Sequence, residues 1–236
     1  SKMIKPQLAI ITNIAEAHIE NFKNIKGIAK AKSEIINNIQ TNGKVILNRD
    51  DKFFKYLNAK AKQRNIKVIS FGKSIKSDIQ LVRTIQNRKM KKIIVRIHKE
   101  ILKLEIKNIN VYNILASLAT ITELNLNFKK IISEFKNFYP SDGRGRLHNI
   151  RRYKKNFKLI DESYNANPLS VKNALNNFSE IKKYNFKKYL LLGDMLELGK
   201  KSDVYHKQLS KLINISDIDK VFIKGEKSFF TYKNLK

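Results

Sequence analysis

The sequence contains no cysteine, and it has few acidic residues for its length of 236. Without cysteine the chain has no disulfide, no thiolate metal site and no cysteine nucleophile. Long hydrophobic runs are also missing: the apolar stretches at residues 8–12 and 189–192 are far too short to span a bilayer. No segment resembles a secretory signal peptide, so we expect no membrane insertion.

The shortage of acidic residues leaves 20 of them against 49 basic ones, a formal net charge of +29. Basic proteins attract phosphates, and the clusters at 88–92 and 151–155 favour a nucleic-acid-binding protein. However, 40 of the basic residues are Lys and only 9 are Arg, the side chain that grips phosphate bidentately. Lys, Ile and Asn together supply 99 residues, a trio that AT-rich codons encode, and both clusters also fit solvated turns. Composition alone leaves both interpretations open.

Hydrophobic patterning predicts an α/β fold. Short buried strands are expected at 8–12, 45–47 and 68–71, with helices near 24–40 and 52–64 between them. From 78 to 106 apolar and polar residues alternate, which predicts a small antiparallel sheet with a turn at 87–92. A helix is expected from 110 to 123. The pattern up to residue 123 therefore predicts a mixed sheet with helices.

A loop rich in Pro, Gly and Ser at 139–146 divides the chain into expected domains 1–138 and 139–236. After it, strands are expected at 157–160, 189–192 and 221–223, with helices at 168–182 and 201–213. This alternation is typical of a second, Rossmann-like α/β domain.

One lysine interrupts an apolar helical stripe. Residues at helical spacing between 24 and 40 share one side: Ile25, Ile28, Lys32, Ile35 and Ile39. Lys32 either extends its amine to water along the stripe or is a buried lysine with a depressed pKa. Periodicity alone favours the first.

Polar loops follow several predicted strands, where ligands of open α/β sheets gather. His18 follows the first strand, and Asp161 begins a loop that ends in Asn165, Asn167 and Pro168. Asn167 and Pro168 also suit the start of a helix. The stretch 192–199 repeats this arrangement after the next strand, and the two loops are expected to converge on one crevice.

The glycine-containing linker and a helix start provide further candidates. Arg144 and Arg146 stand beside Gly143 and Gly145, where they either grip a phosphate or are solvated charges. Asn110 and Asn113, three residues apart, have the chemistry to pair with an adenine edge, but that spacing carries little weight in a chain with 26 Asn.

Together, five stretches of the sequence resemble the Mur ligases of bacterial cell-wall synthesis, in the MurF branch that acts on UDP-N-acetylmuramoyl-tripeptide and D-alanyl-D-alanine. The stretches are residues 11–18 (ITNIAEAH), 29–35 (AKAKSEI), 47–51 (LNRDD), 161–168 (DESYNANP) and 192–199 (LGDMLELG). The last two are the most specific, because sister branches differ there.

The resemblance implies a cytoplasmic, ATP- and Mg²⁺-dependent amide ligase that joins these two substrates through an acyl phosphate. It implies that His18 binds Mg²⁺ and that Lys32 is carbamylated and helps hold a second metal ion. It assigns adenine contacts to Asn110 and Asn113, and a phosphate contact to Arg144, with Arg146 as the alternative. Asp161 would lie near the ribose and phosphates, with Asn165 and Asn167 lining the same loop.

The sequence also departs from the family pattern. It lacks the family's Gly-Thr-Asn-Gly-Lys-Thr phosphate loop, the acidic Mg²⁺ ligand, the UDP-sugar domain and a late Lys-Gly-Ser stretch, and Ile109 replaces a usual histidine. We therefore expect about half of a ligase, inactive alone, whose partner is a missing N-terminal portion of the same enzyme. The alternatives are a basic nucleic-acid-binding protein, or another Mur or folylpolyglutamate-type ligase.

Overall fold

The computed structural model describes residues 4–17, 19–86, 91–106 and 110–236. The chain divides into two compact units, one of Ser1–Ile14 with Lys26–Tyr139 and one of Ala15–Ile25 with Pro140–Lys236. Across the described ranges, no helix combines the length and the apolar character needed to cross a bilayer.

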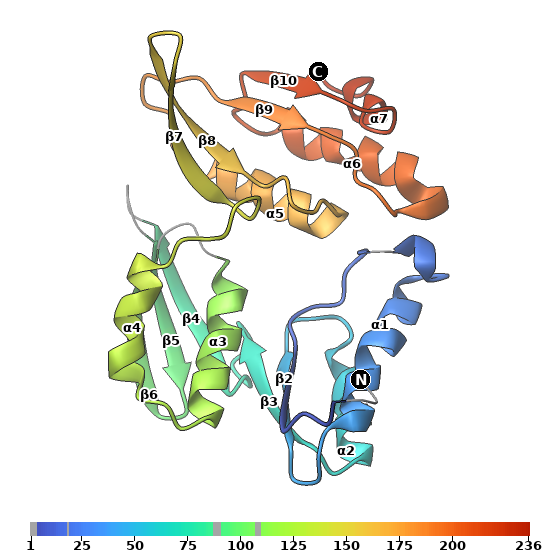
Figure 1. Ribbon diagram of the computed structural model, residues 1–236, viewed down its shortest axis with the longest axis vertical. Helices are drawn as coiled ribbons and strands as arrows, with labels where there is room; N and C mark the ends of the chain where they lie inside the picture. The colour runs from blue at the N-terminus through green and yellow to red at the C-terminus, as the bar shows by residue number, and fades with distance from the viewer. Residues whose placement is uncertain (1–3, 18, 87–90, 107–109) are drawn as a thin grey trace. The chain divides into compact units, whose positions relative to one another are not determined.

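A six-stranded mixed sheet forms the centre of the first unit (Figure 1). Its strands lie in chain order: β1 (Leu8–Ile11), β2 (Lys44–Asn48), β3 (Lys67–Gly72), β4 (Ile79–Gln86), β5 (Lys91–Ile97) and β6 (Glu100–Ile106). Strands β1 to β4 pair in parallel, and β4 to β6 pair antiparallel. The antiparallel strands expected at 78–106 therefore continue the parallel sheet, because Phe71 pairs with Ile79. Of the expected turn, residues 87–90 lie outside the described residues.

Helices cover both faces of this sheet. They are α1 (Ile25–Ser33), the 3₁₀ helix η2 (Glu34–Asn38), α2 (Phe54–Gln63), α3 (Val111–Glu123) and α4 (Phe128–Asn137), of which α4 was not predicted. Ile46 packs with Leu115 of α3 in the main core, while Val45 and Leu47, which point the other way, are also fully buried. Burial on both sides explains why β2 is a continuous apolar run.

The helix predicted at 24–40 is not continuous. It ends as an α-helix at Ser33 and continues as the 3₁₀ helix η2. The Ser33 hydroxyl donates a hydrogen bond to the Lys30 carbonyl at 2.6 Å. Such side-chain bonds compete with the helical backbone, which gives a local reason for the change.

Two small sheets and three α-helices make up the second unit. The strands are β7 (Arg146–Arg152) and β8 (Lys155–Asp161), which are antiparallel, and β9 (Tyr189–Leu192) and β10 (Lys220–Ile223), which are parallel. The helices are α5 (Pro168–Ser179), α6 (Ser202–Asn214) and α7 (Phe229–Tyr232), with 3₁₀ helices η1 (Ile19–Asn21) and η3 (Gly199–Lys201). The sequence did not predict β7. The basic cluster at 151–155 forms the tip of the β7–β8 hairpin, where Tyr153 and Lys154 have positive φ.

The core of the second unit lies between the β9–β10 sheet and its helices. Leu192, Leu175 of α5 and Leu209 of α6 are buried together there. Ile19 also packs against this core, and the Glu20 amide donates to the Glu197 carbonyl at 3.0 Å. Residues 15–25 therefore belong to this unit, although they lie far from the rest of it in the sequence.

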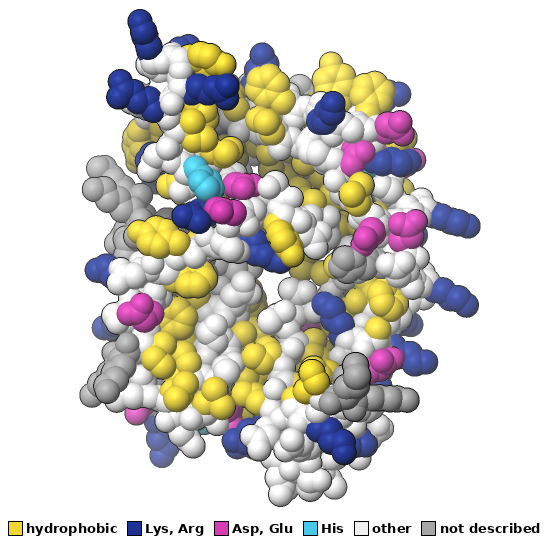
Figure 2. All heavy atoms as spheres, in the orientation of Figure 1, with side chains coloured by type: hydrophobic (Ala, Val, Ile, Leu, Met, Phe, Trp, Pro, Cys, Tyr) yellow, Lys and Arg dark blue, Asp and Glu magenta, His cyan; other side chains and the backbone are white. Residues whose placement is uncertain are grey.

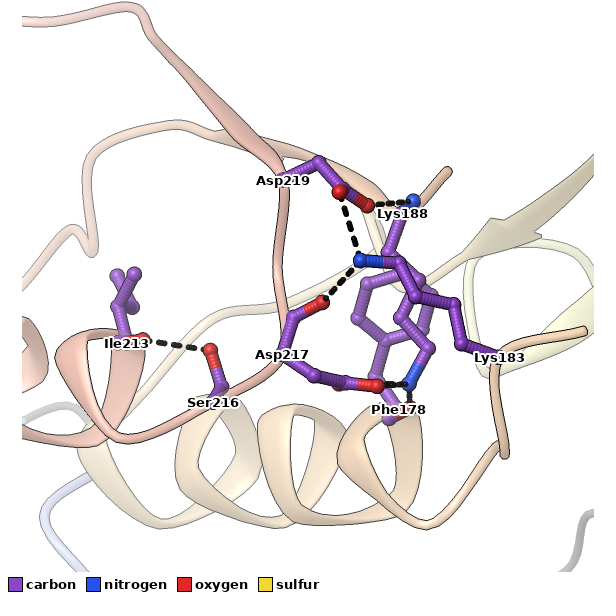
Figure 3. A network of polar contacts seen from close by, with 7 residues as sticks. All are labelled: Phe178, Lys183, Lys188, Ile213, Ser216, Asp217 and Asp219. Atoms are coloured by element: carbon purple, nitrogen blue, oxygen red, sulfur yellow. Dashed lines mark hydrogen bonds and ion pairs between the residues drawn. The ribbon is translucent and has the colours of Figure 1, made fainter. Parts of the chain in front are cut away.

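A buried lysine stabilises one end of the same unit (Figure 3). Lys188, 2% exposed, places Nζ 2.7 and 2.8 Å from the two carboxylate oxygens of Asp217 and 3.0 Å from the Phe178 carbonyl. Lys183 pairs with Asp219 at 2.6 Å, and Asp219 also accepts the Lys188 backbone amide. The ammonium is thus fully partnered, as a buried charge requires.

Candidate functional site

The structure places Lys32 at the margin of the apolar stripe. The buried positions of α1 are Ile28, Ala29 and Ser33, whereas Lys32 is exposed overall, so its stem follows the stripe while part of the side chain is shielded from water. Its Nζ donates to the Asn13 carbonyl at 3.0 Å, at the end of β1. Partial burial lowers the pKa of Lys32, and the nearby Asp51 carboxylate opposes this shift. A lowered pKa enlarges the fraction of neutral, nucleophilic amine.

Asp51 connects the loops that follow two neighbouring strands. Its carboxylate accepts the Ile14 amide at 2.7 Å and the Phe53 amide at 2.8 Å. These bonds fix the loop after β1, which carries the carbonyl that Lys32 contacts. Asp51 belongs to the stretch 47–51 that resembles the family, but its role was not predicted from the sequence. Its position three residues after the end of β2, where ligands of α/β sheets gather, was the sequence feature that could have indicated a functional role.

Asn110 serves the helix that follows it. It is the N-cap of α3, and its side-chain carbonyl accepts the Tyr112 amide at 2.9 Å. Tyr112 in turn donates its hydroxyl to Asp50 at 3.0 Å. Burial, followed by the Asp50 hydrogen bond, raises the pKa of Tyr112 to about 12, so the hydroxyl keeps its proton at neutral pH. Of the two asparagines expected to contact adenine, Asn110 therefore already uses its side-chain oxygen in a hydrogen bond with the Tyr112 amide.

Asn113 lines a hollow in the first unit. This hollow of about 380 Å³ lies between the end of β1 and one side of α3, and its lining is Ile10, Thr12, Asn113, Ala116, Ser117 and Thr120. The structure thus separates the two asparagines by role, with Asn110 at the cap and Asn113 on the wall of a recess.

In the second unit, the glycine-containing linker and the loop after β8 form one structure. The Gly145 amide donates to the Asp161 carbonyl at 2.7 Å, and the Tyr164 amide donates to the Gly143 carbonyl at 3.1 Å. Gly143 has φ of 74°, and a Cβ there would lie 2.7 Å from Tyr164, so the close approach requires glycine.

The two linker arginines differ in their contacts. The Arg144 guanidinium lies 4.3 Å from the centre of the Tyr164 ring, whereas Arg146 pairs with Asp142 at 3.1 Å. The ring holds the Arg144 side chain over the loop after β8 while leaving its N–H edge exposed. This role of Tyr164 was not predicted from the sequence. Arg144 also lies near Glu162: burial and the Asp161 charge raise the pKa of that carboxyl, and the Arg144 charge opposes the rise.

Asp161 lies at the centre of this loop pair. Its carboxylate accepts the Ser163 amide at 3.0 Å and the Gly143 amide at 3.1 Å. Hydrogen bonds from Ser163, followed by the one from Gly143, lower the pKa of Asp161, which keeps it ionised. An ionised carboxylate accepts hydrogen bonds from sugar hydroxyls.

Asn167 is the N-cap of α5. Its side chain accepts the Ser170 amide at 3.0 Å, and the Ser170 hydroxyl accepts the Asn167 amide at 2.9 Å, which is a complete capping box. Asn165 lies exposed in the same loop, ahead of the helix.

The loop at 193–199 is fixed by its own partners. Asp194 accepts the Ser228 and Lys227 amides, and the buried His206 accepts the Met195 amide at Nε2 while its Nδ1 lies 2.8 Å from the Ser202 carbonyl. The expected convergence with the Asp161 loop assumed that β8 and β9 are neighbouring parallel strands. That assumption was wrong, because β8 pairs with β7 and β9 with β10 in separate sheets.

His18 lies outside the described residues. Among the residues that are described, no three His, Asp or Glu side chains gather as a metal site requires.

Comparison with known proteins covers nearly the whole chain. The family model for the Mur ligase middle domain matches residues 1–121, and the model for the Mur ligase, glutamate ligase domain, matches residues 145–233. The UDP-N-acetylmuramoyl-tripeptide--D-alanyl-D-alanine ligase of Bacillus subtilis is 28% identical over 98% of this chain and 48% of its own length.

Solved structures show the same fold. MurF from Acinetobacter baumannii superposes with a TM-score of 0.86 at 23% identity, covering 99% of this chain and 50% of that one. MurF ligase from Thermotoga maritima, determined in complex with ADP, has a TM-score of 0.81 at 22% identity over 98% of this chain and 52% of that one. The chain thus spans about half the length of the relatives it matches.

Proposed function

The chain belongs to the Mur ligase family, and we propose that it forms part of an ATP-dependent ligase that adds D-alanyl-D-alanine to UDP-N-acetylmuramoyl-tripeptide. The observation that carries this proposal is the alignment of 98% of the chain with a Bacillus subtilis ligase of that activity. In the proposed reaction, the terminal carboxylate of the tripeptide takes the γ-phosphoryl group of ATP, and ADP leaves with the electrons of the P–O bond. The neutral amine of D-alanyl-D-alanine then attacks the acyl carbon and loses a proton, and phosphate leaves with the electrons of the C–O bond.

Residues of the first unit would bind the base of the nucleotide and accept CO₂. Asn113, on the wall of the hollow, supports an adenine contact through the carbonyl oxygen and the NH₂ group of its side chain. Asn110 would contribute only its N–H donors, because its oxygen caps α3. Lys32, with its lowered pKa, would add CO₂ as the neutral amine and become an anion. Bound Mg²⁺ would supply charge neutralisation at the phosphates.

Residues of the second unit would orient the sugar and the phosphates. Arg144, held over Tyr164, supports a phosphate contact, and ionised Asp161 supports a ribose contact. Asn165 would line the same loop, while Asn167 acts on it through the start of α5.

We also propose that the chain by itself does not ligate. It spans about half of its relatives' length, and its sequence contains no Gly-Thr-Asn-Gly-Lys-Thr phosphate loop. Without such a loop, the backbone amides that cradle the β- and γ-phosphates are missing.

A chimera tests both proposals. The part of the Bacillus subtilis relative outside the aligned region is fused to this chain to restore full length, and phosphate release is measured with both substrates. We expect D-alanyl-D-alanine-dependent release from the chimera, none from the 236 residues alone, and a loss with Asp161→Ala. A folded chimera that releases no phosphate, or that accepts glutamate or another amino acid instead, would contradict the assignment.

The 236-residue chain also serves to test the alternative that this protein binds nucleic acid. Binding of duplex DNA by the chain, with affinity falling steeply as salt rises, would favour the basic nucleic-acid-binding alternative.

A further inference from the structure

The far end of the β7–β8 hairpin lies in solvent, away from the core of the second unit. All nine residues from 151 to 159 are exposed, and in Figure 1 the hairpin extends beyond α5, the helix that follows it. Arg146 pairs with Asp161 at the base of the hairpin, and Arg152 pairs with Lys155 six residues further along. At the rise of an extended strand, this end lies about 20 Å from the Asp161 loop. Its side chains therefore take no part in the contacts of that loop.

The hairpin tip, residues 151–158, is strongly basic. Five of its eight side chains carry positive charge, namely Arg151, Arg152, Lys154, Lys155 and Lys158. The sequence has no acidic residue between 146 and 160, and within the described parts of the chain none of the five forms an ion pair. The lysine-rich composition does not explain two adjacent arginines, because the whole chain has only nine. The positive charge of the tip is thus local and not neutralised.

Aromatic and apolar side chains stand among these charges. Tyr153 is 81% exposed, Phe157 48% and Leu159 43%. In the antiparallel register Ile150 is opposite Phe157, and His148 is opposite Leu159. Opposite residues of an antiparallel pair point to the same side, so these side chains share one face of the hairpin. The tip therefore combines a cationic end with an exposed apolar face.

The two residues of the turn do not favour the conformation that they adopt. Tyr153 has φ of 52° and Lys154 has φ of 58°, at the two positions of a two-residue hairpin loop. Asn and Gly are the residues that suit positive φ at these positions, because a larger side chain crowds the backbone there. The geometry of the turn therefore does not account for Tyr153 and Lys154, whereas a contact outside the molecule would.

Two observations favour a lipid surface over a nucleic acid as the partner. The Arg152 guanidinium lies 5.0 Å from the centre of the Tyr153 ring, so that face of the ring is not open to a stacking base. The apolar side chains of Phe157 and Leu159 gain nothing from phosphates, but they leave water when they enter the interface of a bilayer.

We propose that the hairpin tip binds the surface of an anionic membrane. The five cations lie at the lipid phosphates, and Tyr153 and Phe157 lie at the level of the headgroups, where aromatic rings are enriched. The strands of the hairpin pair with each other, so its backbone is satisfied at this depth and no spanning segment is needed. The proposal does not depend on the ligase reaction.

Co-sedimentation with lipid vesicles tests the charge. The probes are vesicles of phosphatidylcholine alone and vesicles with about 30% phosphatidylglycerol, and we expect the chain to bind only the second kind. The double change Arg151→Gln and Arg152→Gln should weaken binding about 25-fold, because each cation near the surface contributes about fivefold. The control, Lys207→Gln with Lys211→Gln, removes the same net charge from exposed positions of α6 and should weaken binding much less.

Fluorescence tests the contact of the turn itself. The chain contains no tryptophan, so Tyr153→Trp introduces a single reporter, whose emission should shift to shorter wavelength on anionic vesicles. Tyr153→Asn should weaken binding while the turn stays intact, because Asn suits positive φ, so its effect is not a loss of fold.

Four results would overturn the proposal. They are equal loss of binding from the arginine and lysine pairs, failure to bind anionic vesicles or equal binding to neutral ones, an emission that does not shift, and binding of single-stranded RNA in place of vesicles.

Discussion

Several side chains that could bind a ligand instead stabilise the fold of this molecule. Asn110 and Asn167 cap helices, and Lys188 fills a buried polar site. The sequence predicted the helix starts, but it could not separate a capping asparagine from a ligand-binding one, because both follow a strand and precede a helix. The hydrogen bonds in the structure identify Asn110 and Asn167 as helix caps.

The buried lysine gives a prediction at this scale. Lys188→Met should lower the free energy of unfolding by about 2 kcal/mol, because it removes three hydrogen bonds and leaves Asp217 without its partner; the partial exposure of Asp217 keeps the loss moderate. Urea unfolding followed by circular dichroism measures it. Lys183→Met, at a more exposed pair, should cost less than about 1 kcal/mol. Equal losses would contradict the role given to burial.

The proposed carbamylation of Lys32 should depend on pH in a defined direction. Only the neutral amine adds CO₂, and the pKa of Lys32 is lowered, so carbamate should form at a lower pH than on ordinary lysines and increase as pH rises. Carbon-13 NMR in labelled bicarbonate would detect it. Lys32→Arg should abolish the signal, and Lys30→Arg, on the same helix, should not. A signal that survives Lys32→Arg would assign the carbamate elsewhere.

At the scale of elements, the strongest sequence patterns were the most reliable. The strands at 45–47, 68–71 and 189–192 appear because short apolar runs between turn residues have few other solutions. β7 and α4 were not predicted, for two different reasons. β7 is rich in Arg and largely exposed, so it lacks an apolar pattern, and α4 follows another helix closely. The change to 3₁₀ geometry at Ser33 is accompanied by a side-chain hydrogen bond that periodicity does not reveal.

The capping box of α5 predicts a graded mutational series. Asn167→Ala should destabilise the second unit by about 1 kcal/mol, because the Ser170 amide loses its acceptor. Asn167→Asp should restore stability, since a carboxylate also caps. Thermal unfolding of the isolated chain measures both. If the alanine variant were as stable as the parent, the side chain would have to act on a ligand instead.

For the whole molecule, the charge excess is diffuse. Figure 2 shows Lys and Arg side chains scattered over the visible face rather than gathered in one patch. The residues with defined chemical positions, Lys32, Arg144 and Asp161, are a small part of that total. Composition therefore predicted the charge but not where chemistry occurs.

Self-repulsion of this charge predicts a response to salt. Raising sodium chloride from 10 mM to 300 mM should stabilise the chain by about 1 kcal/mol, or ~2–4 °C in Tm, because screening weakens repulsion among like charges. Differential scanning calorimetry measures the shift. Potassium chloride should act alike, as screening is not ion-specific. A lower Tm at high salt would show that attractive pairs dominate.

Residues 15–25 make the second unit a discontinuous domain. The chain leaves the first unit after Ile14, contributes Ile19 to the second core and returns at Lys26. Proteolysis near Tyr139 would therefore not release two self-sufficient halves, and a fragment beginning at Pro140 would lack the Glu20 bond to Glu197. To be isolated intact, this unit would need its early insert relocated, for instance by circular permutation.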